Sequence, residues 1–353
     1  MKLSEILRSK GIVFFQTDRL SLDNYYYEPF QDRDEEFDKN RIFETDKIKD
    51  TRKVNPTNHS LFKYFIDGSR KTYKIGDIIT TDNKFVPAVA GQIGAVCCFR
   101  NKDRKLNLFD IKKRNILMLY DSIQDLDFER IKELFEKQTS SRVLIEVEKY
   151  SYDKMKDDAP TNAAVAALQK NMRDLEIMLL MEMVKSKTLN TDEMLVIDGS
   201  LQFLTQKFDP NIFYNVVGIS KSFNPNLTGI LKGKTHIGVL LAKLEFGERT
   251  AVFKYDTKKY AIGAWYLRIR ERKNVRDPLG GVVKIEKMAL QENLEMGFNS
   301  SLIDNISASI LAERNPTCHG NDDRWPNHLY PIYLTERILK ASFLSDYYFM
   351  NLF

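Results

Sequence analysis

The chain has 353 residues, of which 43% are hydrophobic and 29% charged, a length that permits one large domain or two modest ones. Its 54 Lys and Arg residues against 49 Asp and Glu residues give a formal charge of +5, which permits a polyanionic partner without requiring one. The sequence holds no apolar run of roughly 18 residues, and it starts as an amphipathic segment, so we expect a cytoplasmic protein that does not contact a membrane.

Residues 1–55 are expected to form an N-terminal extension that is distinct from a main domain of residues 56–353. The extension begins with a short amphipathic helix, and its charges alternate in sign from residue 32 to 53, which is typical of a solvated or mobile segment. The main domain then begins with three successive strands, which favours an antiparallel start to a sheet. These strands, and an edge strand that follows them, are predicted at 64–66, 85–99, 115–120 and 143–147.

The longest helical pattern of the chain begins near Asn162 and ends near Lys187. Its apolar residues recur at spacings of three and four, and Glu176 falls inside the face that they form. An unpaired buried carboxylate is costly. Glu176 is therefore expected to meet Arg173 or another cation, to lie at the rim of the apolar face, or to face a metal ion.

Two apolar runs end in the same Asp-Gly-Ser sequence, which provides Asp67 after one run and Asp198 after the other. The apolar residues suit buried strands and the following residues suit turns, so each Asp is expected at the end of a strand. Two such carboxylates side by side would repel each other unless they shared a divalent metal ion. For either Asp taken alone, an ordinary junction between strand and turn is the alternative.

A further buried strand is predicted over 214–222, and it places Lys221 at its end. A cation there suits a phosphate held near metal, and an exposed lysine in a loop is the alternative. The glycine-rich segment 229–235 does not qualify as a phosphate-binding loop, because the first glycine of the required spacing would fall at Thr228.

Strands are expected to continue at 236–244, 250–255 and 264–269. The last of these carries Trp265 and leads into a series of basic residues that includes Arg268 and Arg270. Aromatic rings followed by guanidinium groups favour stacking on, and neutralisation of, a single-stranded nucleic acid. A charged hairpin tip explains the same residues equally well.

The C-terminal part is predicted to be helical over 301–313 and again from 333 to the end. In the last helix Glu336 shares a face with apolar and aromatic residues, so it poses the same question as Glu176. The spacing of Cys318, His319 and His328 does not match a zinc site.

The order of these segments resembles the NurA nucleases, a family with an RNase H-like core. The resemblance spans roughly residues 61–345 and implies an α/β fold, with an RNase H-like mixed sheet flanked by helices, additional strands and C-terminal helices. It further implies action on DNA ends by a homodimer that works with a hexameric HerA-type ATPase. The residues that carry it are Ile66-Asp67-Gly68-Ser69-Arg70, Arg173-Asp174-Leu175-Glu176, Val196-Ile197-Asp198-Gly199-Ser200-Leu201, Val217-Gly218-Ile219-Ser220-Lys221-Ser222 and Tyr330-Pro331-Ile332-Tyr333-Leu334-Thr335-Glu336.

By this resemblance Asp67, Glu176 and Asp198 correspond to the metal-binding acids of the family. At the last position archaeal members have a histidine and others an aspartate, whereas this chain has Glu336, with His328 as the alternative. Carboxylate oxygens suit Mg²⁺ or Mn²⁺.

The implied reaction is hydrolysis of phosphodiester bonds by two divalent ions about 4 Å apart. Lys221 would contact a phosphate, and the segment from Trp265 through Arg268 and Arg270 would guide the strand. Two other functions stay open. One is a catalytically inactive RNase H-like module that binds DNA or the ATPase, and the other is a different RNase H-like enzyme, such as a resolvase or transposase.

Overall fold

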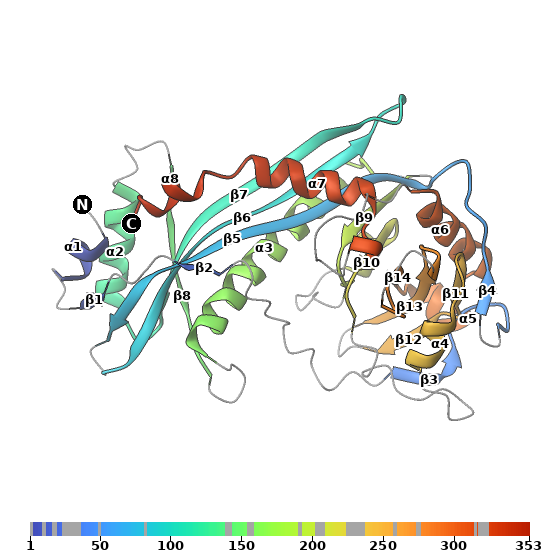
Figure 1. Ribbon diagram of the computed structural model, residues 1–353, viewed down its shortest axis with the longest axis horizontal. Helices are drawn as coiled ribbons and strands as arrows, with labels where there is room; N and C mark the ends of the chain where they lie inside the picture. The colour runs from blue at the N-terminus through green and yellow to red at the C-terminus, as the bar shows by residue number, and fades with distance from the viewer. Residues whose placement is uncertain are drawn as a thin grey trace.

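The protein is an elongated α/β molecule in which a few long strands run along its length and helices cover the sheet (Figure 1). The computed structural model describes residues 3–8, 12–15, 20–22, 37–48, 51–80, 83–137, 143–153, 159–189, 193–201, 209–223, 237–256, 260–272, 277–313, 316 and 325–353. Within these ranges, no helix combines the length and the apolar character that crossing a bilayer requires.

The centre of the molecule is a mixed sheet in which β5 lies between an antiparallel and a parallel half. Strand β6 pairs with β5 and β7 in antiparallel fashion, whereas β9 is parallel to β5 and β10 is parallel to β9. The antiparallel start predicted from the sequence is therefore confirmed, with strands that are longer than expected. The five central strands are β7 (Leu106–Tyr120), β6 (Phe85–Arg100), β5 (Phe62–Ile79), β9 (Met194–Asp198) and β10 (Val216–Ser220).

The sheet continues on both sides of these five strands. Beside β7, strand β8 (Glu146–Tyr150) forms a parallel edge, close to the edge strand predicted at 143–147. Beside β10 follow β14 (Val282–Met288), β13 (Ala261–Arg268), β12 (Phe253–Asp256) and β3 (Phe37–Ile42). The short strands are β1 (Val13–Phe15) and β2 (Leu20–Ser21), which pair with β5, and β11 (Glu248–Thr250), which pairs with β13 and with β4 (Thr51–Lys53).

Helix α3 (Pro160–Lys185) is the predicted long helix, and it precedes β9. It supplies the crossover that two parallel strands such as β5 and β9 need. The other helices are α1 (Leu3–Arg8), α2 (Asp125–Lys137), α4 (Ile237–Lys243), α5 (Gln291–Met296), α6 (Ser300–Ala312), α7 (Tyr330–Ala341) and α8 (Asp346–Met350), with single 3₁₀ turns η3 (Pro210–Phe213) and η6 (Trp325–Asn327).

Two hydrophobic cores lie on opposite faces of the central strands. Ile66 of β5 and Ile197 of β9 belong to the core that includes residues of α3, whereas their neighbours Phe65 and Val196 belong to the core that includes residues of α6 and α7. Successive side chains of a strand point to opposite faces, so the position of a residue along β5 or β9 decides which helices it meets.

The segment 236–244 was predicted as a strand, and this prediction is wrong for its described part. Residues Ile237–Lys243 form helix α4, in which Ile237 and Leu241 are buried and lie on one face. A short continuous apolar run does not distinguish a strand from a buried helix, and here the four-residue spacing of the buried side chains is the helical one.

The described parts of residues 1–55 are integrated into the sheet and do not form a separate extension. Their strands β1, β2, β3 and β4 all pair with strands of the main domain. Buried Arg249 adds a further connection, because it pairs with Glu44 at 3.1 Å and with Asp304 at 2.7 Å. The alternating charges that suggested a solvated segment are partly used in such ion pairs.

Candidate active site

Asp67 lies in the middle of a strand, not at its end as the sequence suggested. Strand β5 continues to Ile79, because the residues after Asp67 keep pairing with β6: Asp67 is opposite Val96 and Gly68 is opposite Ala95. The Asp67 side chain is buried, and its Oδ2 atom has no hydrogen-bond partner among the described residues. A buried carboxylate oxygen without a partner is costly, so this one calls for a cationic ligand or a functional explanation.

Asp198 ends strand β9, as predicted, and lies beside Asp67. Ile66 is the register partner of Ile197, so the two acids follow at equivalent positions of adjacent parallel strands and on the same face. After Asp198 the chain turns at Gly199, whose φ of 106° favours glycine. Gly199 N donates to the carbonyl of Ile219 at 2.8 Å, which fixes the turn against β10.

Lys221 follows strand β10 and brings an ammonium group to the two acids, on a side chain that is only 17% exposed. Its Nζ atom lies 2.7 Å from Oδ2 of Asp198. Asn327 in η6 fixes the Lys221 backbone, because its Nδ2 donates to the Lys221 carbonyl at 2.7 Å. The sequence predicted a cation at this strand end, and the structure places it against a carboxylate.

Glu336 approaches the same group of charges from helix α7. It interacts electrostatically with Asp67 and with Lys221, and it pairs with Lys340 at 2.7 Å one helical turn along. The charge of His328 also acts on Glu336. The two alternatives for the last site position therefore lie in one region of the structure, with His328 buried and Glu336 partly exposed.

Glu176 reaches β5 from helix α3, on the face opposite to the Asp67 side chain. The Gly68 backbone N–H donates to the Glu176 carboxylate, and a Cβ atom at Gly68 would collide with Oε1 of Glu176 and lie 3.1 Å from Cγ of Met172. Only glycine leaves this space at residue 68. Because Gly68 faces α3, strand alternation turns Asp67 to the other face. Asp198, at the end of β9, interacts electrostatically with both acids.

The protonation of the two buried acids reflects this crowding. Burial raises the pKa of Asp67 well above its ordinary value, and the Asp198 carboxylate raises it further, against the opposing effect of Lys221. Burial likewise raises the pKa of Glu176 to about 8, with Asp198 adding to the rise and Arg173 opposing it. Both acids would ionise more readily if a further positive charge entered the site.

For Lys221 and Glu336, unlike for Asp67 and Glu176, the neighbouring charges outweigh the effect of burial on the pKa. Burial lowers the pKa of Lys221, but the carboxylates of Asp198, Asp67 and Glu336 outweigh it and raise that pKa above its ordinary value. Burial raises the pKa of Glu336, but Lys221 and Lys340 outweigh it and the pKa is lowered. Lys221 and Glu336 are therefore both charged at neutral pH.

A second layer of charge supports the turn after Asp198, and sequence reasoning missed it. Glu286 in β14 is fully buried and accepts hydrogen bonds from Ser200 Oγ and Leu201 N, both at 2.7 Å, while Lys284 pairs with it at 2.6 Å. Strand β14 was not predicted, because the charges of Val-Val-Lys-Ile-Glu-Lys-Met conceal the strand. The only signal was its alternation of apolar and charged residues.

The donor atoms of the site suit a hard divalent cation. Asp67, Asp198 and Glu336 offer oxygen ligands of the kind that Mg²⁺ and Mn²⁺ prefer, and Oδ2 of Asp67 lacks any other partner among the described residues. Across the described part of the chain, however, no three His, Cys, Asp or Glu side chains already stand close enough together to hold a metal ion. The chemistry of the donors fits such a cation, but its binding would require the Lys221 ammonium group to leave Asp198 and the carboxylates to move closer together.

The strand that carries Trp265 does not form a nucleic-acid surface, and the prediction is wrong for two of its residues. Trp265 and Arg268 are both 0% exposed. The Trp265 indole donates to Ser307 Oγ at 3.0 Å, and Arg268 donates to the backbone carbonyls of Gly280 and Pro278 at 2.8 and 2.7 Å. Arg270 is half-buried and donates to the carbonyl of Pro316 at 2.8 Å. Strand β13 is central in this part of the sheet, which explains their burial.

Three of the segments singled out in the sequence lie outside the described residues. They are the glycine-rich segment 229–235 with Thr228, the pair Cys318 and His319, and the basic residues 273–276.

Two comparisons with known proteins gave no match to the chain. A scan against protein-family models found no family that matches it. A search of curated proteins found no match either.

Proposed function

We propose that the chain is a metal-dependent DNA nuclease with an RNase H-like core, which processes DNA ends as a homodimer together with a hexameric HerA-type ATPase. The observation that carries the proposal is that Asp67, Asp198 and Glu336 lie around Lys221, while Glu176 interacts with Asp67 and Asp198 from the opposite face of the sheet. These four acids come from β5, α3, β9 and α7, elements that are far apart in the sequence.

Such a group of acids destabilises the fold. Its presence therefore calls for a functional explanation. Like charges in a buried site raise one another's pKa, and an unpartnered buried oxygen lacks the hydration it would have in water. An ordinary structural site would pair each acid with its own cation, as Arg100 pairs with Glu313 at 2.6 Å elsewhere in this protein. Here Lys221 is the shared cationic partner of three acids, Asp198, Asp67 and Glu336.

The order of the central strands supports the RNase H-like assignment. An antiparallel meander of β5, β6 and β7 is followed by β9 and β10, which are parallel to β5 and reached through helix α3. The acids lie on the first strand, at the end of the following parallel strand, and on two helices, which matches the motif order on which the sequence resemblance rests.

In the reaction, Asp67, Glu176, Asp198 and Glu336 would hold Mg²⁺ or Mn²⁺. These ions, when bound, lower the pKa of water and neutralise charge on the phosphate. Lys221 would leave Asp198 and contact a phosphate oxygen, a role that suits a buried ammonium group. The Gly68 backbone N–H would hold the Glu176 carboxylate in place, and Glu286 would hold the turn that presents Asp198.

The ion pair between Lys221 and Asp198 is the observation that favours the second candidate, a catalytically inactive module. A lysine that permanently occupies the metal position would leave an RNase H-like platform able only to bind DNA or the ATPase. A third candidate, a resolvase or transposase, shares the same acids and differs by its preference for branched or specific DNA over free ends.

A cleavage assay separates these functions. Labelled single-stranded, blunt double-stranded and branched DNA would be incubated with the protein, with Mn²⁺ or with a chelator, and in the presence of the cognate ATPase where one is encoded nearby. We expect Mn²⁺-dependent cleavage that Asp198→Asn abolishes without loss of fold. Asp256→Asn, at the exposed end of β12 and outside the acidic group, is the matched control. If the wild type cleaves no DNA under any of these conditions, the catalytically inactive module becomes the favoured function.

A further inference from the structure

A large cavity lies next to the acidic group but does not contain it. It has a volume of about 1120 Å³ and opens between the β6–β7 hairpin, the start of β5 and the start of α7. Lys63 and Tyr330 line it, and the same two elements carry Asp67 and Glu336 further along. Lys63 and Asp67 are about 13 Å apart at the rise of a strand, and Tyr330 and Glu336 about 9 Å apart at the rise of a helix.

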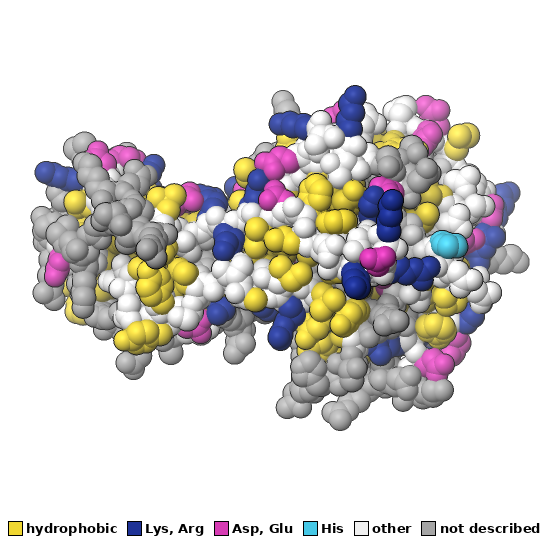
Figure 2. Space-filling view, turned by 90° about the horizontal axis from the view of Figure 1, so that it is seen from above, with side chains coloured by type: hydrophobic (Ala, Val, Ile, Leu, Met, Phe, Trp, Pro, Cys, Tyr) yellow, Lys and Arg dark blue, Asp and Glu magenta, His cyan; other side chains and the backbone are white. Residues whose placement is uncertain are grey.

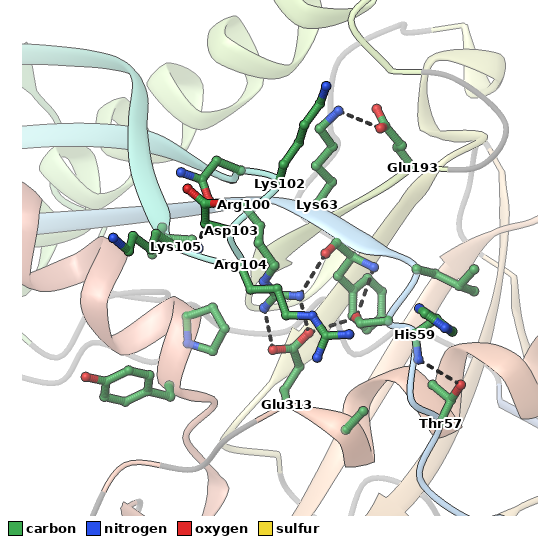
Figure 3. A pocket seen from close by; sticks show the side chains of 18 of the residues that line it. Thr57, His59, Lys63, Arg100, Lys102, Asp103, Arg104, Lys105, Glu193 and Glu313 are labelled. Atoms are coloured by element: carbon green, nitrogen blue, oxygen red, sulfur yellow. Dashed lines mark hydrogen bonds and ion pairs between the residues drawn. The ribbon is translucent and has the colours of Figure 1, made fainter.

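The cavity is basic at its rim. Lys102, Arg104 and Lys105 at the tip of the hairpin are exposed, and none of them forms an ion pair with a carboxylate in the described ranges. Figure 3 shows Lys102 extending in the same direction as Lys63, while Arg104 points toward Glu313. Figure 2 shows Lys and Arg side chains on the broad part of the molecule, seen from above, with acidic and hydrophobic side chains among them.

The basic residues on the floor of the cavity are neutralised by ion pairs. Arg100 pairs with Glu313 through both terminal nitrogens, at 3.0 and 2.6 Å, and Ser60 Oγ donates to the same carboxylate at 2.8 Å. Lys63 pairs with Glu193 (Figure 3). The excess of positive charge therefore lies at the hairpin tip, where the three basic residues stand with one acid, Asp103, and where phosphates can reach them from solvent.

An aromatic ring completes the cavity. Tyr330, the first residue of α7, is 39% exposed and lies among the lining residues. Exposed cations beside an exposed aromatic side chain suit a single nucleic-acid strand, whose phosphates bind the cations while an unstacked base lies on the ring. A duplex keeps its bases stacked and would use only the cations.

We propose that this cavity binds the backbone of a single nucleic-acid strand and leads it to the acidic group. The inference rests on the proposed function, because it assigns the entry of the substrate to the same site.

Binding without cleavage tests the proposal. A fluorescein-labelled 20-nucleotide oligo-dT and a labelled 20-base-pair duplex would be titrated with Asp198→Asn protein in a chelator, and anisotropy recorded at several salt concentrations. The test variant combines Lys102→Ala, Arg104→Asn and Lys105→Ala, with asparagine chosen because Arg104 has a φ of 61°. The matched control combines Arg130→Ala in α2 with Lys243→Ala in α4, both exposed and outside the cavity.

We expect the test variant to bind the single strand at least about tenfold more weakly, with a salt slope lower by about 2 for three lost phosphate contacts. The control should bind as before. Tyr330→Ala should weaken single-strand binding about fivefold or more and duplex binding little. Unchanged single-strand binding by the test variant would overturn the proposal, and equal losses for duplex and single strand in Tyr330→Ala would overturn the single-strand assignment.

The outcome is independent of the nuclease assay. If the wild type cleaves DNA and the test variant binds as before, the proposed role of the cavity is wrong and the proposed nuclease function stands. If the test variant binds more weakly and the wild type does not cleave DNA, the proposed nuclease function is wrong and the cavity stands as a binding site for a single strand. Melting temperatures of all variants check that each is folded.

Discussion

Lys221 Nζ lies 2.7 Å from Asp198 Oδ2, so the ammonium group that interacts with Asp198, Asp67 and Glu336 occupies one of the proposed metal ligands. A divalent ion and an ammonium group would compete for this carboxylate. The lysine would then stabilise the protein without metal, and in the protein with metal it would be free to contact a phosphate.

Lys221→Met tests this competition. Removal of the ammonium charge should tighten Mn²⁺ binding about tenfold, a change of about 1.4 kcal/mol, while lowering both the rate of cleavage and the melting temperature of the metal-free protein. Calorimetric titration with Mn²⁺ measures the affinity. Lys340→Met is the control, because Lys340 is 48% exposed and pairs only with Glu336 among the described residues, so its loss should change the affinity less. Weaker Mn²⁺ binding by Lys221→Met would contradict the competition.

Asp67→Asn should inactivate the protein and at the same time stabilise it. The pKa of Asp67 is raised well above its ordinary value, so a neutral side chain of the same shape avoids the ionisation that burial opposes. A gain of about 1 kcal/mol or more at pH 8 is expected, since one unit of pKa corresponds to about 1.4 kcal/mol. Urea unfolding in a chelator measures the gain, and cleavage should fall at least about 100-fold. Lower stability of Asp67→Asn would assign the carboxylate a structural role.

Glu176 should make the stability of the metal-free protein depend on pH. Its pKa rises from 4.5 to about 8 on folding, so the folded state favours the protonated form. The stability present below pH 4.5 is then lost progressively as the pH rises to about 8. Glu176→Gln can still accept from the Gly68 N–H and lacks this loss, so its melting temperature should exceed that of the wild type at pH 8 and match it near pH 4. If the melting temperatures of the two proteins differed by the same amount at every pH from 4 to 8, ionisation of Glu176 would not be the cause of the pH dependence.

Gly68→Ala should displace Glu176 and reduce cleavage. The added methyl would overlap with Oε1 of Glu176, and overpacking of this kind costs about 1–3 kcal/mol. Gly91→Ala in β6 is the matched control, because its methyl would also press on α3, 2.8 Å from Cδ1 of Leu168, without touching an acid. Both variants should melt at lower temperature. Cleavage per folded molecule should fall only in Gly68→Ala, and an equal fall in both would show that packing alone is responsible.

Much of the fold follows from local pattern, and the exceptions have physical reasons. The period of apolar residues predicted α3, and the continuous apolar runs predicted β9 and β10. The segment after Asp67 was interpreted as a turn, because Asp-Gly-Ser usually forms one, yet pairing with β6 carries the strand on for twelve more residues, to Ile79. Long-range pairing of this kind is not encoded in a short segment.

The candidate site was predictable as a set of residues but not as a geometry. Strand ends and apolar helix faces pointed to Asp198, Lys221 and Glu336, which the structure brings together, and to Glu176, which interacts with Asp198 from the opposite face of the sheet. Nothing local indicated that Gly68 makes room for Glu176, or that Glu286 holds the turn after Asp198. The nucleic-acid surface predicted from the aromatic and basic residues around Trp265 is wrong, because these side chains are buried on a central strand.

The uninterrupted course of β5 has one more consequence, for how this gene can change. Since side chains alternate along a strand, inserting or deleting a single residue between Lys63 and Ile66 would rotate Asp67 to the α3 side and Gly68 away from Glu176. Changes of two residues would restore the sidedness of both. Related sequences should therefore vary in length here only by even steps.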